Sequence, residues 1–269
     1  MKRRQAPFAA LMQKIIIAAA ALAILISGRA TAGDLSPVYG APPLGYGAPP
    51  PIPFYNWTGF YLGAHVGGGW NETDWFEDAA SSGSGGFAAP GFDDGTVNAS
   101  GFLAGGQAGF DFQTGWVLWG IQADGSWANI TGSAGCFGEV VGTTQSCSQS
   151  VNGLGTIAGR IGAAYNAFLI YFLAGAAWEH EQLQNTCVVC GPPPTISVSG
   201  VAWGYTVGLG LEYAFARNWS AFLQYNYVDF GTRDVSFAGV FTENIRENMN
   251  IFKVGVNYRF GWDSGPIRY

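Results

Sequence analysis

Regular alternation of apolar and polar side chains is the feature that most constrains what this sequence can fold into. It is clearest between Tyr205 and Phe230. From 205 to 215 every odd-numbered residue is large and apolar, whereas the even-numbered residues are mostly small or polar. A period of two predicts a β-strand. The alternation resumes at Trp219 after a tight turn at 216–218, so the two segments predict an antiparallel hairpin.

Composition decides which face of such strands is inside. In a water-soluble barrel the apolar face forms the core, whereas in an outer-membrane barrel it contacts lipid and the polar face lines the lumen. Charged residues make up 11% of the chain, whereas soluble domains have about 25%. We therefore expect the apolar faces to contact lipid. A soluble, lipocalin-like secreted barrel is the structural alternative, and the low charge argues against it.

The same alternation predicts eight strands. They lie at 57–70, 101–113, 116–127, 151–165, 168–181, 205–215, 219–230 and 248–260. Long connections follow the first, third, fifth and seventh strands, and short turns follow the others. This asymmetry is typical of outer-membrane barrels, whose periplasmic turns are short and whose external loops are long. The sequence predicts an all-β, eight-stranded antiparallel up-and-down transmembrane β-barrel at 57–260, located in the outer membrane with both termini in the periplasm.

The segments outside the barrel have their own signatures. Residues 1–32 resemble a secretory signal, with a basic start, an apolar run and an Ala30-Thr31-Ala32 cleavage site. The apolar run is shorter than the roughly 20 residues that span a bilayer, and an uncleaved anchor is the alternative. Residues 33–56 contain YGAPP twice and predict an extended periplasmic arm, which is a spacer, a ligand for a periplasmic partner or a tether to peptidoglycan. Residues 261–269 form a C-terminal tail.

Charged residues at inward positions predict a polar network in the lumen. Eight strands enclose an interior only just wide enough for side chains to fill it. Buried charges are costly unless they are paired, so we expect an ionic network that crosses the lumen and plugs it. Glu179 sets the phase of the fifth strand, because a charge on the lipid face is unfavourable. The predicted network comprises Asp111, Asp124, Arg160, Glu179, Glu212, Lys253 and Arg259.

The phase also predicts how individual positions respond to substitution. Leu209→Arg places a base in lipid, whereas Gly210→Leu crowds the lumen and Gly210→Ser is expected to be mild. Aromatic residues near the strand ends predict the interfacial girdle of a membrane barrel. They are Trp57, Phe112, Trp116, Tyr165, Tyr213, Phe215, Trp219 and Phe260.

Four cysteines lie in the predicted external loops. In an exported chain they predict disulfides between near neighbours, Cys136 with Cys147 and Cys187 with Cys190. The CVVC segment also has the spacing of a redox motif, but it lacks the helix N-terminus that lowers the thiol pKa in such motifs. We therefore expect a structural bridge.

Several segments together resemble a known family. They are WTGFYLGAHVGGGW at 57–70, GGQAGFDFQ at 105–113, GRIGAAY at 159–165, GLGLEYAFARNWSAFLQYNYVDFG at 208–231 and KVGVNYRF at 253–260. They resemble the small alphaproteobacterial outer-membrane β-barrels called outer membrane immunogenic proteins, of the opacity/porin-like class. The resemblance implies an abundant surface protein; some members are described as haemin-binding and some as porins. The cysteine pairs and the doubled YGAPP depart from the common pattern.

Function follows from these features as a set of expectations. We expect a non-enzymatic surface protein with a structural role in the cell envelope and immunogenic external loops; a small porin and a haemin-binding protein are the alternatives. The two histidines, His65 and His180, lie in no recognisable Ser/His/acid setting. We expect no cofactor and no metal, since the acids of 71–100 fit no calcium-loop template.

Partners are predicted from location and charge. Lipid and lipopolysaccharide are the expected contacts, and the external loops are where host or environmental ligands would bind; the oligomeric state is open. Removal of residues 1–32 takes away five of the twelve basic residues and none of the eighteen acidic ones. The strongly acidic remainder argues against nucleic acid as a partner.

Overall fold

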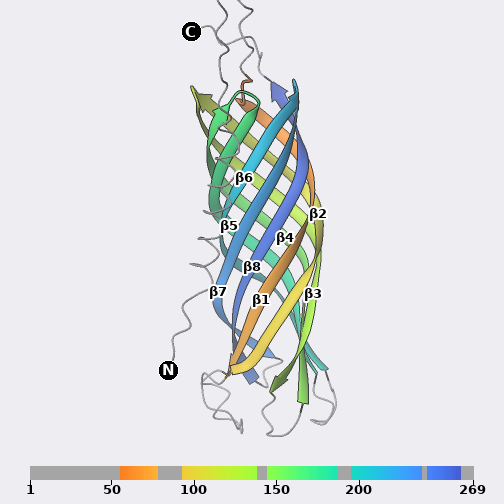
Figure 1. The fold of residues 1–269 in the computed structure, drawn as a ribbon. Helices are drawn as coiled ribbons and strands as arrows, with labels where there is room; N and C mark the ends of the chain where they lie inside the picture. The colour runs from red at the N-terminus through yellow and green to blue at the C-terminus, as the bar shows by residue number, and fades with distance from the viewer. Residues whose placement is uncertain (1–54, 78–92, 138–143, 187–194, 238–240, 262–269) are drawn as a thin grey trace, which may run out of the picture. The chain divides into compact units, whose positions relative to one another are not determined.

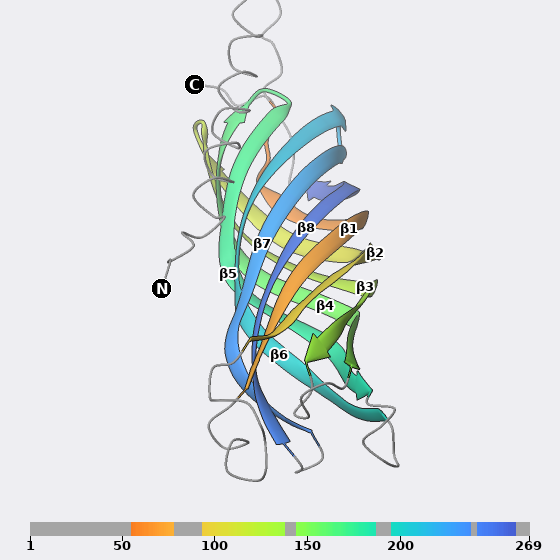
Figure 2. The same cartoon turned by 60° about the horizontal axis from the view of Figure 1, so that its bottom comes forward.

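Eight strands form one closed barrel in which β1 also pairs with β8 (Figures 1 and 2). The computed structural model describes residues 55–77, 93–137, 144–186, 195–237 and 241–261. The strands are β1 (Gly59–Glu77), β2 (Asp93–Thr114), β3 (Val117–Phe137), β4 (Thr144–Tyr165), β5 (Phe168–Thr186), β6 (Thr195–Ala216), β7 (Trp219–Phe237) and β8 (Phe241–Gly261). Every neighbouring pair is antiparallel. The predicted fold class is confirmed.

The predicted inward and outward phase holds on all eight strands. On β6, Glu212 is fully buried, whereas 43% of Tyr213 is exposed on the opposite face. On β5, Glu179 points inward with Tyr171, and Phe172 points outward. Many large aromatic and aliphatic side chains, such as Phe60, Ile121 and Phe172, are exposed on the outer face of the barrel, as lipid contact requires. No helix in the described part of the chain is long and apolar enough to cross a membrane.

The strands extend further toward the long external loops than the sequence predicts. Segments 71–77 and 93–100, expected to be loop, belong to β1 and β2, and segment 241–247 belongs to β8. The reason is visible on β8, where the outward apolar residues end at Phe252 and the inward residues become apolar, as at Met249 and Ile245. Beyond the lipid the outer surface meets water, so the pattern inverts to polar outside and apolar inside, as in a soluble barrel.

This inversion divides the barrel into two parts. The membrane half of each strand runs from the short-turn end of the barrel to the last large apolar or aromatic outward side chain before the outward face becomes polar, and the remaining length is the outer half. These last residues are Trp70, Phe102, Trp127, Ile157, Trp178, Val201, Tyr227 and Phe252 on β1 to β8 in order. Near the border of the two halves β6 and β7 separate: their pairing ends at Tyr205 and Asp229, although the strands continue to Thr195 and Phe237.

Apolar and polar layers alternate along the lumen. One apolar cluster, which includes Leu118 and Leu169, lies near the short turns. A second, which includes Leu103 and Ile251, lies at mid-length. A third, which includes Trp75, fills the outer half. Inward side chains between these clusters are polar or charged.

Trp57 does not belong to the interfacial girdle. Its side chain is fully buried in the apolar cluster near the short turns. Its backbone N–H donates to Gln113 at 2.8 Å, and the Arg259 guanidinium lies 5.2 Å from its ring. Trp57 precedes the first residue of β1, Gly59, so strand alternation does not govern its direction. It closes the lumen instead of facing lipid.

Some predicted segments lie outside the described residues. These are the signal at 1–32, the arm up to 54, the tail from 262 and the cysteines at 187 and 190. Their assignments stay predictions.

Candidate functional site

The first polar layer of the lumen is centred on Arg160. Its Nε lies 3.3 Å from Asp111, and its Nη2 lies 3.1 Å from Glu212. Arg259 joins the same carboxylates from β8, with Nη2 3.0 Å from Asp111 and 3.6 Å from Glu212. All four side chains are buried. Two acids and two bases thus compensate one another, which buried charges require.

Neutral groups complete the surroundings of Arg160. Its Nη1 donates to the Tyr61 hydroxyl at 2.7 Å and to Gln122 at 3.2 Å. Its guanidinium carbon lies 4.0 Å from the centre of the Tyr171 ring, where the negative face of the ring attracts a cation. Arg160 is therefore held on several sides and cannot swing away from the carboxylates without losing all of these contacts.

A second ion pair lies further along the membrane half. Lys253 pairs with Asp124, which also accepts a hydrogen bond from Thr156. His65 Nε2 lies 2.8 Å from Ser126 Oγ in the same region. The other ring nitrogen of His65 has no hydrogen-bond partner among the described residues. Alternation predicts that His65 and Ser126 point inward but not that they meet, because the contact depends on the register across β2, where Gly105 lies between them.

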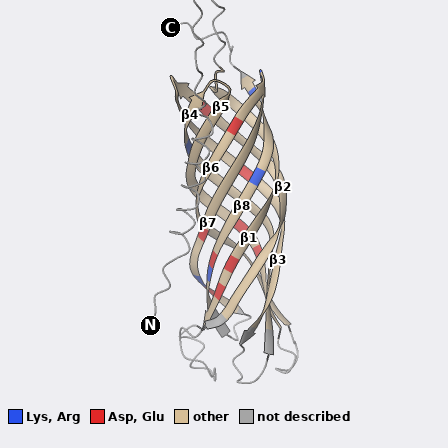
Figure 3. Cartoon of the chain, viewed as in Figure 1, with Lys and Arg blue, Asp and Glu red and all other residues tan. Residues whose placement is uncertain are grey.

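The structure brings six of the seven predicted network residues into ion pairs within the membrane half. Glu179 is the exception, and the expectation that it faces the three bases is wrong. On β8 the inward residues Ile251 and Met249 separate Lys253 from the outer half, and Glu179 lies beyond this apolar layer. Figure 3 shows that charged residues occupy only short, scattered parts of the described strands.

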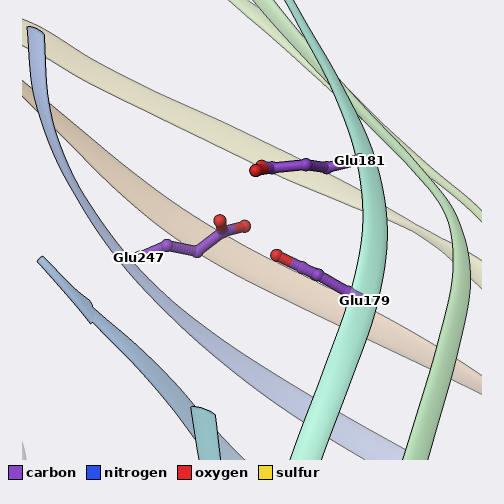
Figure 4. A group of neighbouring side chains, drawn as sticks. All are labelled: Glu179, Glu181 and Glu247. Atoms are coloured by element: carbon purple, nitrogen blue, oxygen red, sulfur yellow. The ribbon is translucent and has the colours of Figure 1, made fainter. Parts of the chain in front are cut away.

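Glu179 belongs to a group of three buried acids, here called the outer carboxylate cluster: Glu179 and Glu181 from β5 and Glu247 from β8. Each offers an oxygen atom, and these atoms lie within 4.8 Å of one another. Figure 4 shows the three carboxylates converging on one region. Arg233 from β7 pairs with Glu181 and lies 3.0 Å from Glu247. Three acids therefore face one base.

The three acids are not equally supported. Glu247 accepts hydrogen bonds from the amides of Asn71 and Gln149, the first at 2.7 Å. Glu181 accepts from Gln149 at 3.4 Å. Neither carboxylate oxygen of Glu179 has a hydrogen-bond partner among the described residues, and its side chain is fully buried. Glu181 lies in the outer half, beyond the membrane. Burial raises the pKa of its carboxyl to about 7, and the neighbouring charge of Glu247 acts in the same direction.

Two irregularities in the strands place the partners of this cluster. In β7 a register shift between Asp229 and Gly231, with Gly231 at a φ of 71°, switches the inward face to Arg233. In β4 the register shifts between Val151 and Gly153. Even-numbered residues point inward in the membrane half, whereas odd-numbered ones such as Gln149 point inward beyond the shift. A bulge adds one residue and so reverses the side-chain phase. A period-two reading cannot see this reversal.

The remaining candidates are placed as follows. Cys147 is disulfide-bonded, and in the strand register it lies opposite Ala134, two positions from Cys136. The pairing of Cys136 with Cys147 stays a prediction. His180 is exposed on the outward face of β5.

The chain resembles known outer-membrane proteins. The family model described as outer membrane protein beta-barrel domain matches residues 18–260. The chain is 30% identical to the 31 kDa outer-membrane immunogenic protein of Brucella melitensis over 221 residues, covering 78% of this chain and 86% of that protein. It is 26% identical to the 25 kDa outer-membrane immunogenic protein of the same organism over 261 residues, covering 93% and 99%. The crystal structure of the outer membrane protein OprG from Pseudomonas aeruginosa aligns at 12% identity with a TM-score of 0.48, covering 78% of this chain and 99% of that one.

Proposed function

This chain belongs to the outer membrane protein beta-barrel family, and we propose that it is a non-enzymatic, structural barrel of the cell surface whose lumen is closed to ions. The family match confirms the resemblance read from the sequence and the location in the outer membrane. The first and last strands meet through Gly59 and Gly261 at the end of the short turns, which is the periplasmic end in such barrels.

The packing of the lumen is the observation that carries this proposal. In the membrane half, Arg160, Lys253 and their acidic partners have fully buried side chains. Beyond them, the apolar layer that includes Leu103 and Ile251 is also buried. An ion crossing the barrel would meet tightly paired charges and then an apolar barrier. Eight-stranded barrels are just wide enough for this kind of filling.

The alternative functions receive less support from the geometry. A porin needs a continuous polar path, and the apolar layer interrupts it. Haem ligation by both histidines is not possible, because His65 is 3% exposed and contacts Ser126 inside the barrel, whereas His180 lies on the outward face of β5. The same contact does not make a hydrolytic site, because Nδ1 of His65 has no orienting acid among the described residues and the pair is closed to substrate.

Partners of such a barrel follow from its surfaces. The apolar outward band of the membrane half contacts lipid, and the polar outer half stands at the level of lipopolysaccharide head groups. We infer that recognition of host or environmental ligands takes place at the external loops, since the lumen offers no room for it.

Conductance in planar bilayers tests the proposal. Purified, refolded protein should give little or no steady current. Arg160→Ala removes the centre of the first polar layer and should admit brief, flickering openings if the barrel still folds, which its altered gel mobility without boiling would establish. Large, stable, ohmic channels from the unmutated protein would overturn the closed lumen.

A further inference from the structure

The outer carboxylate cluster has the geometry of an oxygen-ligand cation site. Its three carboxylates offer oxygen atoms within 4.8 Å of one another. Two oxygens on opposite sides of Ca²⁺, each at about 2.3–2.6 Å, lie at most about 5 Å apart. The three glutamates can therefore bind one ion without moving their strands. The side chains converge from β5 and β8 onto the same space in Figure 4.

Glu179 points independently to a missing partner. It is fully buried, both of its oxygens are without a hydrogen-bond partner among the described residues, and its carboxylate is aimed toward Glu247. A buried, unpaired carboxylate is among the costliest groups in a protein interior. Arg233 and Gln149 hold the neighbouring carboxylates of Glu181 and Glu247 in place. The unsatisfied oxygens of Glu179 therefore lie beside two fixed carboxylates.

The charge balance favours a divalent partner when the three acids are ionised. Among the described inward residues of this layer, three carboxylates face the single guanidinium of Arg233. Two negative charges are uncompensated when all three acids are ionised. One divalent cation balances them. The amides of Asn71 and Gln149, which donate to Glu247, orient its oxygens as supporting groups do around metal sites.

We propose that Glu179, Glu181 and Glu247 bind one Ca²⁺ ion within the outer half of the barrel. The donor set is all oxygen, which suits hard cations and disfavours zinc and copper. Ca²⁺ accepts irregular, mixed coordination by carboxylates, whereas Mg²⁺ demands an octahedron and retains several waters. Apolar side chains such as Met249 and Leu183 lie on the two sides of the cluster and favour the ion that needs fewer waters.

The separation of β6 and β7 supplies an entrance. Beyond Tyr205 and Asp229, toward the external loops, these strands are not paired with each other. A hollow at this place is lined by residues of β5, β6 and β7, among them Glu181, Val201 and Arg233. Arg233 is 22% exposed there, so an ion from the cell exterior reaches the cluster past its side chain. The inference is independent of the closed lumen, because the entrance is lateral, at the border between the two halves, and does not pass through the ion pairs of the membrane half.

Calorimetric titration with CaCl₂ tests the site. Folded full-length protein in detergent micelles, stripped of metal with a chelator, should bind one Ca²⁺ per chain, with a Kd of about 10⁻⁴–10⁻³ M as in other extracellular sites. Ca²⁺ should also raise the temperature at which the barrel unfolds. Gel electrophoresis measures this temperature, because the folded barrel migrates differently from the unfolded chain. Absence of both effects up to about ten times that concentration would overturn the proposal.

Two variants locate the binding. Glu179→Gln keeps the shape of the side chain and should weaken Ca²⁺ binding by at least about tenfold, while the metal-free barrel still folds because a neutral amide relieves the repulsion among three buried acids. Glu72→Gln removes an exposed acid from the outward face of β1 and should bind as the unmutated protein does. Unchanged affinity in Glu179→Gln would place the ion elsewhere and overturn the assignment.

Discussion

The membrane half and the outer half of this barrel are continuous in backbone but opposite in construction. In the membrane half, apolar side chains such as Phe172 face outward and charged ones such as Arg160 face inward. In the outer half, polar residues such as Gln184 are outside and Trp75 is inside. The inward acids and bases balance in the membrane half, whereas acids exceed bases in the outer half. The solvent around each half accounts for both differences: lipid supplies no ions or water, so charges inside it must compensate one another.

Removal of Arg160 should have the largest effect. Arg160→Ala leaves Asp111 and Glu212 with Arg259 as their shared base, inside the part of the barrel that water does not reach. We expect a loss of about 3–5 kcal/mol of unfolding free energy, measured by urea unfolding in lipid vesicles. Arg246→Ala, at an exposed position of β8, is the control and should change stability by less than about 0.5 kcal/mol. Equal effects would show that the paired charges do not stabilise the membrane half.

Arginine placed on the outward face of β6 tests where the two halves meet. Leu209→Arg puts a base in hydrocarbon and should cost about 2–4 kcal/mol. Ser199→Arg lies on the same face of the same strand, in the outer half, where water surrounds it. It should cost less than about 0.5 kcal/mol. Urea unfolding in vesicles measures both variants, and similar losses would mean that the lipid band extends over the outer half.

Crowding of the lumen is the third test. A Cβ atom at Gly210 would overlap the ring of Tyr171, whose hydroxyl donates to Gln224 at 2.9 Å and whose ring lies against Arg160. The expectation that serine is mild here is therefore wrong. Gly210→Ser should cost about 1–3 kcal/mol. Gly125→Ser, on the outward face of β3 where a Cβ meets nothing within 4 Å, should fold and melt as the unmutated protein does.

Sequence alone predicted the membrane half well for a physical reason. Lipid on one side and a narrow lumen on the other force strict alternation, so the directions of Glu212 and Tyr213 could be read from parity. The outer half has water outside and a mixed interior, which weakens the contrast between faces. The bulge at Gly231 and the shift near Asn152 then reverse the phase. A period-two pattern therefore places Glu247 in a loop and does not predict its proximity to Glu179.

A signal for the outer half was nevertheless present in β8. The large apolar residues change from even positions at 252–260 to odd positions at 245–251. A strand that leaves the lipid and continues in water must make this change, since its apolar side chains then belong inside. A change of parity without a turn residue thus marks a strand that continues beyond the membrane, and it would have placed Glu247 inward.

The smallest effect is expected at Arg233, which is the counterpart of Arg160 in the outer half. Arg233→Ala also removes a base that pairs with two acids. Its side chain is 22% exposed beside the separation of β6 and β7, so water and dissolved cations can take over part of its role. Partly exposed ion pairs contribute about 0.2–1 kcal/mol each, so the loss should be about 1 kcal/mol. Urea unfolding of Arg233→Ala and Arg160→Ala side by side, in the same metal-free vesicles, measures the difference. If Arg233→Ala is as damaging as Arg160→Ala, the outer half excludes water as completely as the membrane half does, and the division of the barrel by its surrounding solvent fails.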